Sequence, residues 1–366
     1  MLIKFEVTGF KNFENKIELD FSKARDYKFN SSCVANDVLQ KIIIYGKNSV
    51  GKSNLGLALF DIVPNLTSNN VTPGLYDEYL NVNNKEGFAE FHYIFSFGSN
   101  KIYYTYHKNE KRDIILENIT VNGKILYHFD YEVESGDLAN LREQFPTLNL
   151  DFRAGDSILK YVIANSKLED DHPLYQMHKY VSEMLWFRNL EENRYIGYTT
   201  RTNDYYDFIS KEGMLEEFED LLRRADIKGG LSIKTDLDGK QTLYFMGPTL
   251  LPFFRTASSG TKALYTFFYW YKTATNASLV FIDEFDAFYH YELSEIIVEM
   301  MKEKSGCQSI FTTHNTNLFS NGIMRPDCYF ILTYDKLTPI VDATRRELRE
   351  GHNLEKLYMS GEFDAC

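Results

Sequence analysis

Alternating apolar and polar residues in the first third of the chain predict antiparallel β-structure. Residues 1–22 alternate as a β-hairpin does, with a turn near residues 12–15. Residues 87–129 hold several more short alternating runs, and turn-forming residues such as Gly98 and Asn122-Gly123 separate them. We expect the runs of residues 87–129 to form an antiparallel sheet.

The pattern changes after about residue 130. Apolar residues then recur at helical spacing, notably over residues 174–186 and 214–222. Further on, Asp238-Gly239 lies between two alternating runs, which is a strong hairpin signal. We interpret residues 131–245 as a mainly helical insertion whose helices either pack on the rest of the molecule or bind a partner.

Two continuous apolar runs, residues 42–45 and 279–282, predict strands that are buried on both faces, as in a parallel sheet. The predicted fold class is therefore α/β, with a mixed central sheet built from both chain ends and an antiparallel sheet beside it. The expected division of the chain is 1–130, 131–245 and 246–366.

Composition and charge narrow the function classes. The net charge is −12, so the chain has no global basic field to attract nucleic acid, although a local basic groove would still allow DNA or RNA binding. The four cysteines, Cys366 among them, form no C-x-x-C pair, which argues against a zinc site and fits a reducing cytosol. No apolar run is long enough for a membrane span, and the first residues read as a strand and not as a signal peptide. We expect a cytoplasmic protein without a membrane partner.

The first apolar run leads directly into a complete phosphate-binding loop, G-x-x-x-x-G-K-S. Gly46 and Gly51 allow the tight backbone in which amides point at phosphate oxygens. Lys52 would reach the β- and γ-phosphates of ATP, and the Ser53 hydroxyl would bind Mg²⁺. The expected ATP-binding residues of this loop are Gly46, Lys47, Asn48, Ser49, Val50, Gly51, Lys52, Ser53 and Asn54.

The second apolar run ends in Asp283 and Glu284. Asp283 is placed to hold Mg²⁺, and Glu284 to orient or deprotonate the water that attacks the γ-phosphate. A further strand, residues 308–312, leads to His314, which would lie on the rim where α/β sheets bind ligands and could contact the γ-phosphate. Lys52, Glu284 and His314 are thus the expected catalytic residues.

Another small-residue turn, Ser258, Ser259 and Gly260, precedes a helix expected to begin near Lys262. A helix N-terminus of this kind can bind a phosphate, although such caps are commonly structural.

These motifs resemble, in their order, the ABC-type ATPase heads of SMC proteins, RecF and the overcoming-lysogenization-defect (OLD) group. The residues that carry the resemblance are GFKNF, GKNSVGKS, ASSGT, VFIDEFD and TTHN. The chain is most similar to stand-alone bacterial AAA-family ATP-binding proteins of the OLD-like branch, many of which belong to phage-defence or abortive-infection systems. The closing LREGHNLEKLYMSGEFDA also resembles the tail of that branch.

The resemblance implies roles for further residues. Lys11 and Asn12 would lie near the nucleotide, and Asp286 would fall in the D-loop at a dimer interface. Ser258, Ser259 and Gly260 would form the signature that contacts the ATP of the opposite subunit, so a homodimer or higher even oligomer is expected. The signature departs from the LSGGQ of transporter heads, since Ser259 replaces the first glycine. No TOPRIM nuclease of full OLD proteins is expected in this chain.

Three functions compete at this point: an ATPase that controls a separately encoded effector in antiphage defence, a RecF-like DNA repair or recombination ATPase, and a non-hydrolysing nucleotide-gated scaffold. Asp283 and Glu284 argue against the scaffold. Four tyrosines of residues 131–245 are either exposed anchors for a partner or packed on the head. They are Tyr195, Tyr198, Tyr205 and Tyr206.

Overall fold

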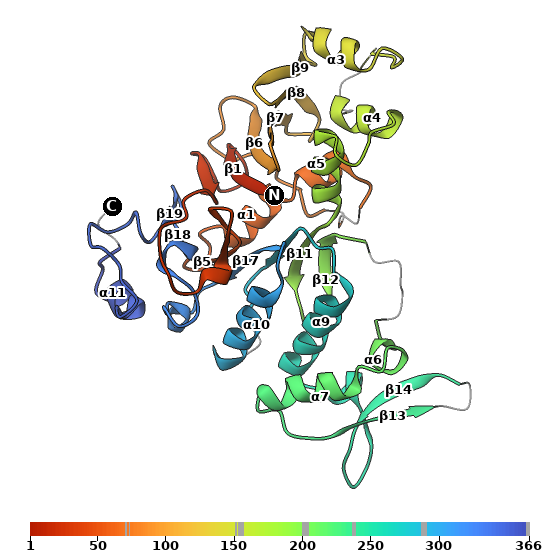
Figure 1. Cartoon of the computed structure of the whole chain (residues 1–366), viewed down its shortest axis with the longest axis vertical. Helices are drawn as coiled ribbons and strands as arrows, with labels where there is room; N and C mark the ends of the chain where they lie inside the picture. The colour runs from red at the N-terminus through yellow and green to blue at the C-terminus, as the bar shows by residue number, and fades with distance from the viewer. Residues whose placement is uncertain are drawn as a thin grey trace.

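The computed structural model of the chain describes residues 1–69, 72, 74–150, 152, 157–199, 205–235, 239–286 and 291–363. Asp238 of the predicted hairpin and Cys366 lie outside these residues. Within them the chain forms two seven-stranded sheets, one three-stranded sheet and one two-stranded sheet (Figure 1). None of the described helices is long and apolar enough to cross a membrane.

The central sheet is mixed, with five parallel strands between two antiparallel edge strands. In spatial order its strands are β12 (Arg194–Gly197), β11 (Met184–Asn189), β16 (Leu279–Ile282), β17 (Gln308–Thr313), β5 (Lys41–Tyr45), β18 (Tyr329–Leu332) and β19 (Leu337–Pro339). The two predicted apolar runs are β5 and β16, and both strands are buried along their whole length. The α/β fold class with a mixed central sheet is confirmed.

The second large sheet is antiparallel throughout. In spatial order its strands are β10 (Ser135–Asp137), β9 (Lys124–Asp130), β8 (Ile114–Val121), β7 (Asn100–Asn109), β6 (Phe88–Phe97), β1 (Leu2–Thr8) and β2 (Ile17–Asp20). The runs of residues 87–129 form an antiparallel sheet, as predicted, and the hairpin of residues 1–22 joins the same sheet. The smaller sheets are β13 (Leu231–Thr235), β14 (Gln241–Phe245) and β15 (Leu251–Pro252), and β3 (Val34–Ala35) with β4 (Val38–Leu39).

Helices cover the sheets and link them. The α-helices are α1 (Lys52–Leu59), α2 (Ile62–Leu66), α3 (Ala139–Gln144), α4 (Ile158–Asn165), α5 (Pro173–Ser182), α6 (Phe208–Lys211), α7 (Leu215–Arg224), α8 (Phe253–Thr256), α9 (Ser259–Thr273), α10 (Tyr291–Glu303) and α11 (Leu354–Met359). Short 3₁₀ turns are η1 (Ser31–Cys33), η2 (Thr316–Leu318) and η3 (Pro326–Cys328). In Figure 1, α9 and α10 lie side by side on the central sheet; α6 and α7 pack against α9, with β13 and β14 next to them.

The segment 131–245 differs from the mainly helical insertion that its periodicity predicted. It supplies β11 and β12 to the central sheet and β10 to the antiparallel sheet, besides the hairpin of β13 and β14. The predicted helix over 174–186 ends as α5 at Ser182, and the chain then continues as β11. The physical reason is the apolar run from Met184 to Phe187, which is buried on both faces once β11 pairs with β16.

Helix α1 lies between the two large sheets. On one side, a Cβ atom at Gly56 would lie 2.9 Å from ring atoms of Trp186 and 3.2 Å from Phe281, both in the central sheet. On the other side, the Tyr93 hydroxyl of the antiparallel sheet donates to the Ala58 carbonyl (3.0 Å). Just beyond α1, the buried Asp61 carboxylate pairs with the Lys108 ammonium (2.7 Å). These contacts fix the helix whose N-terminus carries the phosphate-binding loop.

Candidate functional site

The phosphate-binding loop has the strand–loop–helix arrangement that its sequence predicts. It leaves β5 at Gly46 and enters α1 at Lys52, with Gly51 at a positive φ of 105° before the helix. Lys47, Asn48, Ser49 and Ser53 are exposed, so the outer side of the loop is open to a ligand. The buried Lys52 ammonium donates to the carbonyls of Gly46 (2.9 Å) and Lys47 (3.2 Å), both in the loop.

Asn12 braces this loop from the antiparallel sheet. Its side-chain amide donates to the Val50 carbonyl (2.9 Å), and its Oδ1 accepts from the Asn54 side chain (2.7 Å). Lys11, expected near the nucleotide, instead directs its ammonium to the Asp77 carbonyl (2.6 Å). Of the two neighbours, Asn12 is the one in contact with the loop.

Asp283 and Glu284 lie at the carboxyl end of β16, beside the start of α1. Burial raises the pKa of the Asp283 carboxyl above its usual range, and hydrogen bonds from Ser53 and Thr312 oppose that rise. The Thr312 hydroxyl donates to Asp283 Oδ1 at 2.6 Å and accepts from the Glu284 amide at 2.8 Å. This neighbouring strand therefore holds both acidic residues in place.

Glu284 is the more exposed of the two acids, and its backbone is strained. Its φ of 43° lies in the left-handed region, which is uncommon for a residue with a side chain and is concentrated at functional sites. Its carboxylate lies 4.0 Å from the Lys52 ammonium and is half exposed. The strained backbone thus presents a carboxylate toward the open side of the phosphate-binding loop.

The segment after β17 adds the predicted rim residues. The Thr313 hydroxyl donates to Asp286 Oδ2 (2.8 Å), and His314, which follows directly, is exposed. Asp286 Oδ1 is buried and has no hydrogen-bond partner among the described residues. The structure therefore brings Lys52, Ser53, Asp283, Glu284 and His314 to one edge of the central sheet.

Ser258, Ser259 and Gly260 lie apart from this group, at the N-terminus of α9. The helix begins at Ser259, three residues earlier than its sequence suggested, because the Ser258 hydroxyl caps it by accepting from the Thr261 amide (3.2 Å). Ser258 and Ser259 are exposed. The contacts of the described residues give this turn a structural role as a cap and do not join it to the phosphate-binding loop of the same chain.

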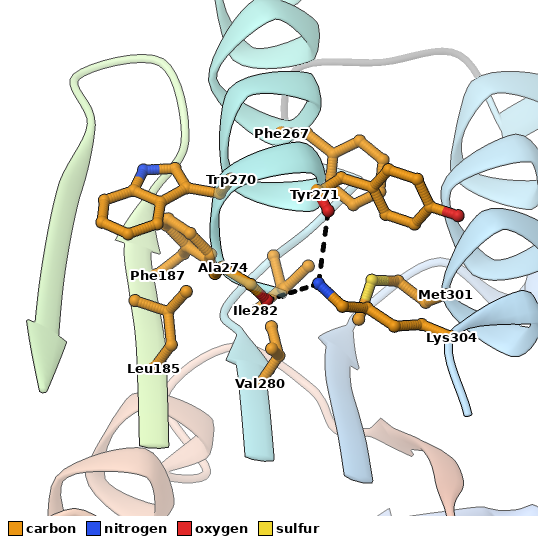
Figure 2. Close-up of a pocket in the computed structure, with 10 residues that line it drawn as sticks. All are labelled: Leu185, Phe187, Phe267, Trp270, Tyr271, Ala274, Val280, Ile282, Met301 and Lys304. Atoms are coloured by element: carbon orange, nitrogen blue, oxygen red, sulfur yellow. Dashed lines mark hydrogen bonds between the residues drawn. The ribbon is translucent and has the colours of Figure 1, made fainter. Parts of the chain in front are cut away.

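The opposite end of α9 is attached to the central sheet and to α10 (Figure 2). Lys304, which follows α10, donates from its ammonium to the carbonyls of Ala274 (2.6 Å) and Tyr271 (3.3 Å) at the end of α9. A small apolar pocket lies between α9, α10 and the central sheet. Side chains of β11, β16 and both helices line it, including Phe187 and Ile282. Lys304 therefore closes the pocket and holds the two helix ends together.

Helix α11, near the tail of the chain, contacts the same edge of the sheet, and no sequence pattern predicted this contact. The Tyr358 ring lies 4.7 Å from the ring of Tyr45, the residue before Gly46. Thr316, two residues after His314, donates to the Glu355 carboxylate (3.2 Å). The tail thus supports the phosphate-binding loop and the segment of His314 at once.

Three of the four tyrosines considered as exposed anchors pack against α9. The Tyr195 ring lies 4.5 Å from Trp270, and the Tyr198 ring 6.3 Å from it. The Tyr205 hydroxyl is 2.6 Å from that of Thr266. Only Tyr206, 63% exposed, keeps the accessibility that an anchor needs. Of the two alternatives left open by the sequence, packing holds for the other three, because α9 presents an aromatic surface that covers them.

Comparison with solved structures gives similarity over nearly the whole chain at low identity. The SmcHead bound to the C-winged helix domain of ScpA is 15% identical, with a TM-score of 0.48, and the match covers 92% of this chain and 96% of that one. The SMC head domain from Thermotoga maritima is 15% identical (TM-score 0.45; 93% and 98% covered). The Smc head domain bound to the C-terminal domain of ScpA from Pyrococcus furiosus is 12% identical (TM-score 0.43; 92% and 95% covered).

No curated protein matches the chain. A protein-family model does, over residues 41–320, which run from β5 past the segment of His314. Because this match spans well over half of its residues, the chain belongs to the P-loop ATPase family described as "AAA domain, putative AbiEii toxin, Type IV TA system".

Proposed function

We propose that this protein binds and hydrolyses ATP with Mg²⁺ and that the hydrolysis cycle controls a partner protein. The observation that carries the proposal is the convergence of Lys52, Ser53, Asp283 and Glu284 at the carboxyl edge of three neighbouring strands. This is the edge where open α/β sheets bind their ligands. The family match supports nucleotide binding.

Each residue of the group has a chemical task in the proposal. The backbone of residues 46–54 and the Lys52 ammonium bind the phosphates. Ser53 and Asp283 hold Mg²⁺, which would neutralise charge on the β- and γ-phosphate oxygens. Both side chains supply the oxygen ligands that Mg²⁺ prefers. Among the described residues, no positively charged side chain lies within hydrogen-bond distance of the buried Asp283 carboxylate, so its charge is not neutralised by a direct ion pair. Glu284 orients and deprotonates the attacking water, and His314 contacts the γ-phosphate.

The proposal includes a dimer that forms around ATP. Ser258, Ser259 and Gly260 are exposed or partly exposed at a helix N-terminus and do not reach the loop of their own chain. In a two-fold dimer they would contact the phosphate held by the partner subunit, with Asp286 near the interface. Hydrolysis would then release the dimer.

Lys52→Ala should weaken ATP binding strongly, because it removes the main positive charge directed at the phosphates. We expect unchanged folding, since the hydrogen bonds from Lys52 to the described residues all go to carbonyls of the loop itself. Isothermal titration calorimetry measures the affinity, and Lys124→Ala, an exposed lysine of β9 outside the loop, is the control. Equal ATP affinity in the wild type and Lys52→Ala would show that the loop is not the nucleotide site.

Glu284→Gln should leave ATP binding intact and lower turnover about 10²–10⁴-fold, because the positioned base is lost. The variant should also accumulate as an ATP-bound dimer, which size-exclusion chromatography with and without ATP would detect. Glu110→Gln, an exposed acid in the turn after β7, is the control. Wild-type turnover in purified Glu284→Gln would remove Glu284 from the mechanism.

Asp283→Asn should abolish the dependence of ATP binding on Mg²⁺ and raise the thermal stability of the nucleotide-free protein. Burial raises the pKa of the carboxyl, so its ionisation opposes folding above the pKa of the unfolded chain. The stability gain should therefore be largest at neutral pH and disappear in acid, where both side chains are neutral. Thermal unfolding from pH 4 to pH 7.5 tests this, with exposed Asp335→Asn as control. A gain that is equal at every pH would exclude the charge as its cause.

We further propose that the partner is a separately encoded effector of an antiphage or toxin–antitoxin system, which the description of the family supports. A second protein encoded in the native operon should then co-purify with this chain. Tyr206→Ala should weaken that association, whereas Tyr334→Ala, 60% exposed beside β18 and β19, should not. A chain that purifies alone from its own operon and protects against phage without its neighbours would contradict this part of the proposal.

A further inference from the structure

Arg188 lies beside the candidate ATP site, although its segment carries none of the sequence motifs. It is the fifth residue of β11, which runs parallel to β16 with Phe187 aligned with Ile282. The Asp283 amide donates to the Phe187 carbonyl (2.9 Å), so the pairing continues to the ends of the two strands. Arg188 therefore lies level with Asp283, one strand spacing of about 4.8 Å away.

The alternation of side chains puts Arg188 and Asp283 on the same face of the sheet. Trp186 and Phe281, two residues before them, both face Gly56 of α1. Phe187 and Ile282 face the other way, into the pocket beneath α9 (Figure 2). The Arg188 guanidinium lies 5.8 Å from the Trp186 ring centroid, as expected for neighbours on one face. Arg188 and Asp283 thus flank the side from which α1 presents Lys52 and Ser53.

The donors of Arg188 are available for a ligand. Its side chain is exposed, and its guanidinium has no hydrogen bond or ion pair with another of the described residues. Partial burial lowers the pKa of the Arg188 guanidinium, and the charge of the Asp283 carboxylate opposes that effect. Arg194, the nearby arginine on β12, is different because its guanidinium is already paired with Glu192 (2.6 Å).

We propose that Arg188 binds the terminal phosphate of ATP and thereby distinguishes ATP from ADP. This inference depends on the proposed ATPase function. Asp283 is the residue that would hold the Mg²⁺ ion of the bound nucleotide, and Arg188 lies about one strand spacing from it, so a terminal phosphate at this edge would be within reach of Arg188. Lys52 approaches the phosphates from β5, on the opposite side of β16. A planar guanidinium with two parallel donors is suited to the terminal phosphate, which has the most free oxygens.

Calorimetric titration without turnover tests the assignment, using Mg²⁺ with either ADP or a non-hydrolysable ATP analogue. Arg188→Gln should bind the analogue about 10- to 100-fold more weakly, as expected for one lost charge-assisted contact, and should bind ADP as the wild type does. Arg194→Gln removes a nearby positive charge that does not lie beside Asp283, so it should change the affinity neither for ADP nor for the analogue. Arg188→Lys keeps the positive charge but lacks the two parallel donors of the guanidinium. This variant should therefore lose part of the preference for the analogue over ADP.

The outcomes separate this inference from the proposed function. Equal losses for ADP and the analogue in Arg188→Gln, or no loss for either, would overturn the assignment while leaving ATP binding by the loop in place. If the wild type bound neither nucleotide, the proposed function and this inference would both fail. Melting temperatures of all variants show whether they fold. If Arg188→Gln does not fold, the affinities of Arg188→Lys for ADP and the analogue are compared with those of the wild type instead.

Discussion

Close packing of α1 on the central sheet is the constraint on which the candidate site depends. Gly56 has no side chain, and the helix therefore approaches Trp186 and Phe281 so closely that a single added carbon would meet their rings at 2.9–3.2 Å. The Tyr93 hydroxyl holds the helix from the other side. A helix fixed on both sides cannot tilt, so its N-terminus keeps the phosphate-binding loop beside Asp283. The position of the loop is thus set by core packing more than by the loop itself.

The order of the parallel strands turns this fixed helix into a site. Strands β16, β17 and β5 end at one edge, and each contributes through the residues directly after it: Asp283 and Glu284, His314, and the loop from Gly46. The contacts between these ends are short-range and mutual. Thr312 of β17, for example, holds both acids of β16. The backbone of Glu284 keeps its strained φ of 43° because the surrounding contacts hold it in that conformation.

Sequence reasoning predicted the parts of the site that are local and missed those that depend on long-range pairing. The phosphate-binding loop and the two acids are contiguous motifs after apolar runs, so their strands and their shared edge could be predicted. Arg188 could not, because its position follows from the pairing of β11 with β16, and the apolar run before it was interpreted as the end of a helix. The contacts of Tyr358 with Tyr45 likewise join the tail to the loop across the whole chain. The spacing of residues within either segment does not indicate that the two tyrosines are in contact.

The attachment of α9 has a consequence for how two subunits would communicate. Ser258 caps its N-terminus, which is exposed, while Lys304 hydrogen-bonds to carbonyls at its C-terminus and so joins it to the end of α10. Phe187 and Ile282 pack beneath the helix, next to Arg188 and Asp283 at the edge that carries the candidate site. Because such a close-packed helix moves as a rigid element, displacement of its exposed end must shift β11, β16 or α10. A partner subunit that contacts Ser258 and Ser259 would therefore act on Asp283 and Arg188 through packing, without touching either residue.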